Sequence, residues 1–115
     1  MNNLNSVLIE GNMVKDPVYS TAPDGTPVCT FSLVSNRSFK KETGIKVKEV
    51  SFFDVETWSK LAEYVNSQGK EGRGIRVIGC LKQNRWADKD GKEQSNVIIV
   101  AEHVEFRPED KDNGK

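Results

Sequence analysis

The chain has 115 residues, enough for one domain and no more. With 36% hydrophobic and 30% charged residues it has the composition of a soluble globular domain, and no apolar run approaches the roughly 18 residues that a membrane span requires. The 17 basic and 17 acidic side chains cancel, so any attraction for a polyanion must come from local patches rather than from the net charge.

The N-terminus and the cysteines indicate the compartment. Residues 1–5 have no cationic start and no long apolar stretch, which argues against a secretory signal. Cys29 and Cys80 are far apart, without CxxC spacing, and both lie in apolar segments. We therefore expect reduced, buried thiols and a cytoplasmic protein.

The N-terminal half is predicted to consist of strands separated by turns. A first strand runs from about residue 5 to residue 13, and Asp16-Pro17 begins the loop that follows. A second strand is predicted over residues 28–36, where apolar side chains alternate along the chain. A long hairpin loop over residues 38–47 then leads to a third strand over residues 48–57.

The C-terminal half contains the only predicted helix. Residues 59–68 carry an apolar stripe at helical spacing, and glycines follow. Strands over residues 75–85 and 96–106 are separated by a turn at Asp90-Gly91, a dipeptide that favours tight hairpins. Residues 107–115 are polar and are expected to form a disordered tail.

Five strands with one helix between the third and the fourth give the element order of the OB-fold, a small Greek-key barrel. We therefore predict an all-β domain over residues 1–106, a five-stranded OB-fold barrel with one short helix. Such barrels bind oligonucleotides and oligosaccharides, but the fold alone does not fix the function.

Basic side chains are concentrated in two segments although the whole chain is neutral. Residues 37–48 contain five Lys or Arg and one acid, and residues 70–92 contain seven and three, which leaves each segment at +4. Such segregation forms a basic groove in some proteins and a merely solvated surface in others.

Two aromatic side chains are predicted to stand on the outer face of the third strand. Phe52 and Trp58 share a parity with two carboxylates, whereas Phe53 and Val55 have the opposite parity. Because burying two carboxylates is costly, we expect Phe53 and Val55 in the core and Phe52 and Trp58 on the polar face.

A third aromatic lies on the fourth predicted strand. Lys82, Asn84 and Trp86 share one parity, opposite to Val77 and Leu81, which are expected to point inward. Trp86 is thus predicted to stand on a basic outer face near the base of a hairpin.

Phe39 begins the basic loop, with Lys40 and Lys41 beside it. Exposed rings among cations suit a nucleic-acid strand with unpaired bases, since a base stacks on a ring and a phosphate meets Lys or Arg. Two alternatives remain: the rings are ordinary core residues, or their face packs against another subunit.

The chain resembles the bacterial single-stranded DNA-binding proteins over about residues 4–106. No single motif decides this, but the order and spacing of six pieces together are specific: Asn5-Ser6-Val7-Leu8-Ile9-Glu10-Gly11-Asn12, Lys15-Asp16-Pro17, Thr21-Ala22-Pro23-Asp24-Gly25-Thr26-Pro27-Val28, Phe31-Ser32-Leu33, Phe52-Phe53-Asp54-Val55-Glu56-Thr57-Trp58-Ser59-Lys60-Leu61-Ala62-Glu63 and Arg85-Trp86-Ala87-Asp88-Lys89-Asp90-Gly91.

The resemblance implies a homotetrameric, nucleoid-associated protein with no membrane partner. It would bind single-stranded DNA without sequence preference, protecting and organising it during replication, recombination and repair. The stacking aromatics of the family match the four rings singled out above, Phe39, Phe52, Trp58 and Trp86. Its phosphate contacts match Lys60 and Lys82, and also Lys40, Lys41 and Arg85.

Members of this family usually continue through a flexible linker to an acidic tip that recruits repair and replication enzymes. This chain ends at Asp112-Asn113-Gly114-Lys115. We therefore expect no such recruitment, whether the chain is a truncated form or a variant from a phage or mobile element.

Other functions are weighed against DNA binding. A related interaction module, of the type of primosomal replication protein N, would lack most of the stacking aromatics that are present here. RNA binding stays open, because stacking and charge do not distinguish the sugar. An enzyme is disfavoured, because His103 is the only histidine and the chain has no Gly-rich phosphate loop and no metal-ligand spacing. We expect no catalytic residue, cofactor or metal.

Overall fold

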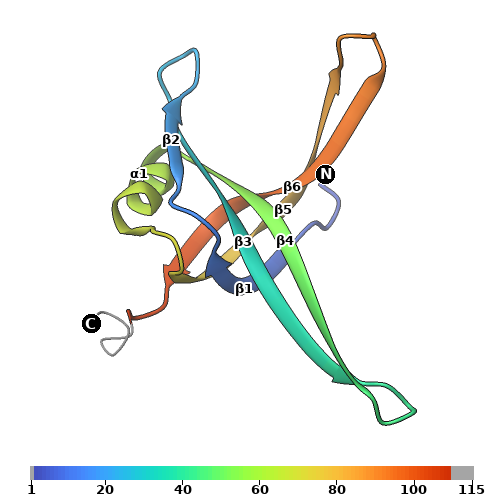
Figure 1. The fold of residues 1–115 in the computed structure, drawn as a ribbon. Coiled ribbons are helices and arrows are strands. Elements are labelled where there is room, and N and C mark those ends of the chain that lie inside the picture. The colour runs from blue at the N-terminus through green and yellow to red at the C-terminus, as the bar shows by residue number, and fades with distance from the viewer. Residues whose placement is uncertain (1, 110–115) are drawn as a thin grey trace.

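The computed structural model describes residues 2–109 (Figure 1). This part of the chain folds into six strands and one helix, in the order β1 (Val7–Met13), β2 (Val18–Thr21), β3 (Pro27–Lys40), β4 (Lys46–Trp58), α1 (Ser59–Gln68), β5 (Gly74–Ala87) and β6 (Glu93–Phe106). No helix within it is long and apolar enough to cross a membrane.

The strands form one sheet that closes on itself. Their order is β1-β5-β6-β4-β3-β2, and β1 pairs in addition with β3. That last pairing, Asn12 with Val34 and Met13 with Leu33, joins the two sides of the sheet into a five-stranded barrel. Since α1 lies between β4 and β5, the predicted OB-fold barrel with one short helix is confirmed.

The barrel interior is filled by alternate residues of its strands and by one face of α1. Ala62 and Val65, three residues apart on the helix, are both fully buried. The helix matches the predicted range of residues 59–68. The largest fully buried apolar side chains are Met13, Leu33, Val55, Val65, Ile75, Val77 and Ile99.

Two strand pairs run on beyond the barrel as arms. β3 and β4 pair without interruption from Val28 and Trp58 to Lys40 and Lys46, so the connecting loop is only residues 41–45. The predicted loop over residues 38–47 is therefore wrong at both ends. We call residues 36–50 the β3–β4 arm and residues 83–97 the β5–β6 arm; both project from the barrel in Figure 1.

The short strand β2 was not predicted. Its four residues pair with β3, from Val18 opposite Thr30 to Thr21 opposite Pro27. All four side chains are exposed, so the strand has no buried face. Without a buried face there is no apolar alternation from which to recognise a strand.

Three predictions about the core need correction. Phe53 and Leu81 have the inward parity but are exposed, because each lies where its ladder leaves the barrel. Cys29 is buried as predicted, whereas Cys80 is only half-buried; both are free thiols.

The C-terminal segment is held against the barrel as far as the structure describes it. The backbone N–H of Arg107 donates to Gly74 O at 3.0 Å, and Lys70 Nζ lies 2.7 Å from Glu109 Oε2. The remainder of the predicted disordered tail, residues 110–115, lies outside the described residues.

Candidate nucleic-acid interface

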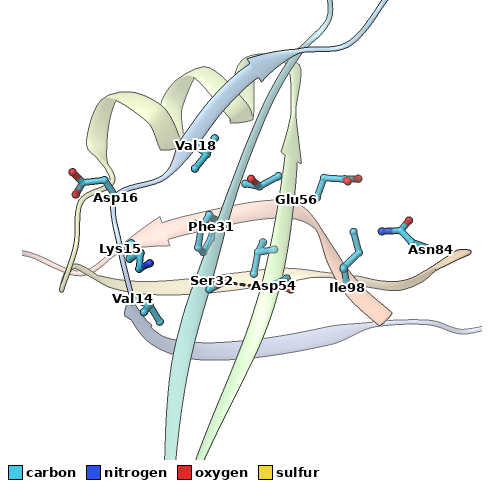
Figure 2. A pocket seen from close by; sticks show the side chains of 12 residues that line it. Val14, Lys15, Asp16, Val18, Phe31, Ser32, Asp54, Glu56, Asn84 and Ile98 are labelled. Carbon is cyan, nitrogen blue, oxygen red and sulfur yellow. Dashed lines mark hydrogen bonds between the residues drawn. The ribbon is translucent and has the colours of Figure 1, made fainter. Parts of the chain in front are cut away.

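A cleft of about 460 Å³ lies over β3 and β4 (Figure 2). Polar side chains line it from these two strands, and they have the parity opposite to the buried Phe31 and Val55. The segment between β1 and β2, with Lys15 and Asp16, borders one side; Asn84 and Ile98 border the other. The cleft is thus open to solvent on the outer face of the barrel.

Phe52 and Trp58 stand on the same face as this cleft. In the β3–β4 ladder Phe52 is opposite Val34 and Trp58 is opposite Val28, and the paired residues between them alternate between core and cleft. The two rings are separated by six residues, about 20 Å along the strand. They are 64% and 37% exposed, so both stand on the polar face, as parity predicted.

Trp86 continues the opposite border of the cleft. It has the same parity as Asn84, which lines the cleft, and lies two residues further out on the β5–β6 arm. The ring is 49% exposed. Three aromatic side chains are therefore exposed on or beside one polar cleft.

The tip of the β5–β6 arm, which follows Trp86, is organised by one carboxylate. Asp88 accepts from the backbone N–H groups of Asp90 and Lys92, both at 2.9 Å, and from Gln94 Nε2 at 3.0 Å. The Lys92 N–H, followed by the Gln94 amide, lowers the pKa of Asp88 below its ordinary value.

Phe39 does not share the face of Phe52. It is opposite Val47 in an unbroken ladder, so it projects from the other side of the β3–β4 arm. The guanidinium carbon of Arg37 lies 4.6 Å from the centre of its ring and covers part of it. Of the four aromatics named from the sequence, the structure brings three to the cleft side and leaves Phe39 on the reverse of the arm.

The candidate basic residues are similarly divided. Lys82 and Lys60 are exposed, Lys82 on the cleft-facing parity of β5 and Lys60 in the first turn of α1, two residues after Trp58. Lys40 has the cleft-facing parity at the end of β3, and Lys41 lies in the arm tip. Arg85 has the opposite parity to Trp86, and its side chain donates to Gln83 Oε1 at 3.2 and 3.1 Å.

Sequence reasoning missed the role of the carboxylates in the cleft. The indole Nε1–H of Trp58 donates to Glu56 Oε1 at 2.8 Å, and Ser32 Oγ donates to Asp54 Oδ1 at 2.6 Å. Lys82 Nζ lies 3.6 Å from the same Glu56 oxygen. The shared parity of Glu56 and Trp58 is the signal in the sequence that places these two side chains next to each other on one face.

Lys15 and Asp16 were also missed as lining residues, although they lie within the stretch that carried the resemblance. The Asp16 carboxylate is fixed by the backbone N–H of Glu71 at 2.8 Å. Among residues 2–109, no group of three or more His, Cys, Asp or Glu is placed to hold a metal ion.

Comparison with known proteins identifies the family of this chain. The model of the single-strand binding protein family matches residues 4–107. The single-stranded DNA-binding protein of Aquifex aeolicus is 42% identical over 101 residues, which are 88% of this chain and 68% of that protein. Single-stranded DNA-binding protein 2 of Chlorobaculum tepidum is 35% identical over 116 residues, covering 100% of this chain and 78% of that protein.

Solved structures show the same fold. A Plasmodium falciparum SSB complex with ssDNA superposes with a TM-score of 0.86 at 18% identity, over 94% of this chain and 98% of that chain. A deletion mutant of the Thermus aquaticus single-stranded DNA binding protein gives 0.82 at 26% identity, over 91% of this chain and 51% of that chain. The match over nearly the whole described part, with relatives above 30% identity, places this chain in the single-strand binding protein family.

Proposed function

We propose that this chain binds single-stranded DNA along the cleft, with unpaired bases stacked on Phe52, Trp58 and Trp86. The observation that carries the proposal is the exposure of Phe52 and Trp58 on one polar face, at either end of the cleft floor. A ring on such a face does not point into the barrel core, and a base stacked on it contributes about 1–3 kcal/mol.

The backbone of the strand would be met by the exposed cations around the cleft. Lys82 lies between the cleft and the β5–β6 arm, and Lys60 lies just past Trp58. Lys40, Lys41 and Arg85 are placed on the arms, where a longer strand would reach them. Each phosphate neutralised adds about 0.7 to the slope of log affinity against log salt.

We propose that Phe39 contacts DNA only when the bound single strand is long enough to pass around the β3–β4 arm. Its ring faces the reverse of the β3–β4 arm, so a strand must pass around the arm to reach it. The function would be general protection and organisation of single strands during replication, recombination and repair, because stacking and phosphate contacts do not read sequence. No catalytic step is part of the proposal.

The test is a comparison of nucleic acids at fixed salt. We expect oligo-dT to bind tightly and to quench tryptophan emission, and we expect duplex DNA of equal length to bind much more weakly, since paired bases cannot stack on the rings. Equal affinity for duplex and single strand, or unchanged emission at saturation, would contradict the proposal. An oligo-U titration beside oligo-dT measures the preference for the sugar.

We also propose self-association into a homotetramer. β1 pairs with β5 over residues 7–12 but with β3 only at Asn12 and Met13, so most of β1 keeps one open hydrogen-bonding edge. Leu8 is exposed on this strand. An open edge with an exposed leucine suits strand pairing with another copy. Light scattering should give four chain masses; a single chain mass at micromolar concentration would contradict it.

The proposed compartment is the cytoplasm. Cys29 and Cys80 are both free thiols, and the thiol of Cys29 is enclosed in the core, which suits a reducing environment. Cell fractionation with a tagged chain tests this, and recovery from an exported fraction would contradict it.

A further inference from the structure

We propose that Glu56 is an internal competitor for the DNA backbone: its carboxylate engages Lys82 and so limits what this lysine contributes to binding. The inference rests on the proposed function. It assigns to Glu56 a positioning and tuning role that follows from contacts within this chain.

One oxygen of Glu56 holds two groups of the cleft together. Oε1 accepts from the Trp58 indole N–H at 2.8 Å and lies 3.6 Å from Lys82 Nζ. Glu56 and Trp58 lie two residues apart on β4, whereas Lys82 comes from β5, on the far side of β6. The contact therefore links a proposed stacking ring to a proposed phosphate ligand across three strands.

The exposures of the Glu56 and Lys82 side chains show why this carboxylate matters. The Glu56 side chain is only 17% exposed, whereas that of Lys82 is 49% exposed. With so little water around the carboxylate, its attraction to a nearby cation is screened less than it would be at an exposed site. Lys82, in contrast, reaches solvent, so it is accessible to a phosphate while it is still bound to Glu56.

The other carboxylates lining the cleft are not arranged in this way. Asp16 accepts from the backbone N–H of Glu71 and Asp54 accepts from the Ser32 hydroxyl. Neither of these two contacts involves a Lys or Arg side chain. Glu56 is thus the lining carboxylate whose described partner is itself a proposed phosphate ligand.

The consequence follows from electrostatics. A phosphate that approaches Lys82 also approaches the Glu56 anion, so part of the attraction is cancelled by like-charge repulsion. Because the Lys82–Glu56 pair carries no net charge, Lys82 contributes less than one full cation to counterion release. Glu56 would therefore weaken binding and flatten its salt dependence while holding the Trp58 ring in place.

The central test is Glu56→Gln. The amide oxygen keeps an acceptor for the Trp58 indole, but the negative charge is removed. We expect oligo-dT to bind about two- to fivefold more tightly near 0.1 M salt, the range that corresponds to a partly exposed ion pair. The salt slope should steepen by up to about 0.7, the value for one further phosphate on a single strand.

Lys82→Gln provides a second test that does not depend on the Glu56 variant folding. In the wild-type background its salt slope should change by clearly less than about 0.7, because Lys82 is already partly neutralised. In the Lys82→Gln background, Glu56→Gln should tighten binding by a smaller factor than in the wild type, because removing the anion then relieves its repulsion of the phosphate but releases no lysine. The inference is overturned if Lys82→Gln alone lowers the salt slope by the full value of about 0.7. It is also overturned if Glu56→Gln tightens binding equally in both backgrounds.

Glu105→Gln is the matched control. It also removes one carboxylate that pairs with a cation, Arg76, at 3.6 Å, but it lies seven residues along β6 from the cleft-lining Ile98, about 23 Å away. Its affinity and slope should equal those of the wild type. If the wild type binds oligo-dT and Glu56→Gln behaves like Glu105→Gln, the competitor role is wrong and DNA binding stands. If the wild type does not bind, both proposals fail.

Discussion

Leu33 and Phe53 face each other across the β3–β4 ladder, yet Leu33 is fully buried and Phe53 is 38% exposed. Leu33 is also paired with Met13 of β1, on the side away from Phe53. This pair marks where the barrel gives way to the β3–β4 arm. Substitutions on the barrel side should change stability, whereas substitutions on the arm should act mainly on binding.

Loss of a cleft ring should weaken binding without unfolding the chain. We expect Trp58→Ala, Trp86→Ala and Phe52→Ala each to reduce oligo-dT affinity by about 1–3 kcal/mol, because each removes one stacking surface. Fluorescence anisotropy with labelled oligo-dT measures this. Tyr64→Ala is the control, since Tyr64 packs edge-on against Phe106, 5.5 Å between ring centres, and does not line the cleft. Wild-type affinity in all three ring variants would contradict the stacking assignment.

The two tryptophans can be observed one at a time. Trp58 and Trp86 are the only tryptophans in the chain, so Trp86→Phe leaves Trp58 as the single indole and Trp58→Phe leaves Trp86. We expect oligo-dT to quench both variants. Quenching confined to one variant would show that the other ring lies outside the bound strand.

Phe39 should matter less than Phe52 for a short strand. Its ring faces the reverse of the arm, and Arg37 covers part of it. We therefore expect Phe39→Ala to leave binding of a short oligo-dT nearly unchanged and to weaken binding of a longer one. Measuring both variants against a series of dT lengths tests this. An equal loss of affinity for Phe39→Ala and Phe52→Ala at the shortest dT length would contradict the placement of the two rings on opposite faces of the β3–β4 ladder.

The tip of the β5–β6 arm should keep its order in mild acid. The Lys92 N–H, with the Gln94 amide, lowers the pKa of Asp88, so the folded tip binds its proton less readily than an unfolded chain does. The contribution of Asp88 is then present above the ordinary carboxyl pKa of about 3.9 and is lost as the pH falls through the lower, folded value. An NMR titration of the Asp90 and Lys92 amides should have its midpoint below 3.9. A midpoint at or above that value would contradict the tip geometry.

The seam between β1 and β3 should tolerate no added atom. A Cβ on Gly11 would collide with Val34 O and Leu33 Cδ1, next to the two pairs that close the barrel. We expect Gly11→Ala to destabilise the fold by about 1–3 kcal/mol in urea unfolding, as overpacked sites do. Gly44→Ala is the contrast, because Gly44 lies in the arm tip with no atom in the way and a φ of 86°. That change carries only the left-handed backbone cost of about 1–2 kcal/mol, confined to the tip. A Gly11 variant with wild-type stability would contradict the close approach of β1 and β3 at this position.

Much of the barrel could be predicted from the sequence because its elements have a buried side. Val55 and Val77 are buried where parity placed them, and α1 covers the predicted range, since each has one face turned to the core. β2 and the arms have no such face, so the pattern of apolar residues carries no information about them. Residues 38–40 therefore seemed to belong to a loop, although they continue β3.

Part of the candidate site could also be predicted from which face of a strand is polar. The rest could not, because it depends on contacts between strands that are distant in the chain. Carboxylates on the face of Phe52 and Trp58 showed that the face is polar, and both rings are exposed there. The side of the arm on which Phe39 lies depends on how far β3 and β4 stay paired. The Glu56–Lys82 contact joins strands that are not neighbours in the chain. Contacts of that kind depend on tertiary placement, which strand periodicity does not encode.

The unbroken pairing of β3 with β4 has a practical consequence. Every rung from Val28 and Trp58 to Lys40 and Lys46 keeps one register, so the arm continues the barrel strands without a bulge up to the five-residue turn that caps the hairpin. That turn is a natural insertion point for a dye-binding peptide or an affinity handle. A reporter attached there would sit at the end of an arm that is continuous with the barrel. Its signal would change when a bound polymer passes around the tip of that arm.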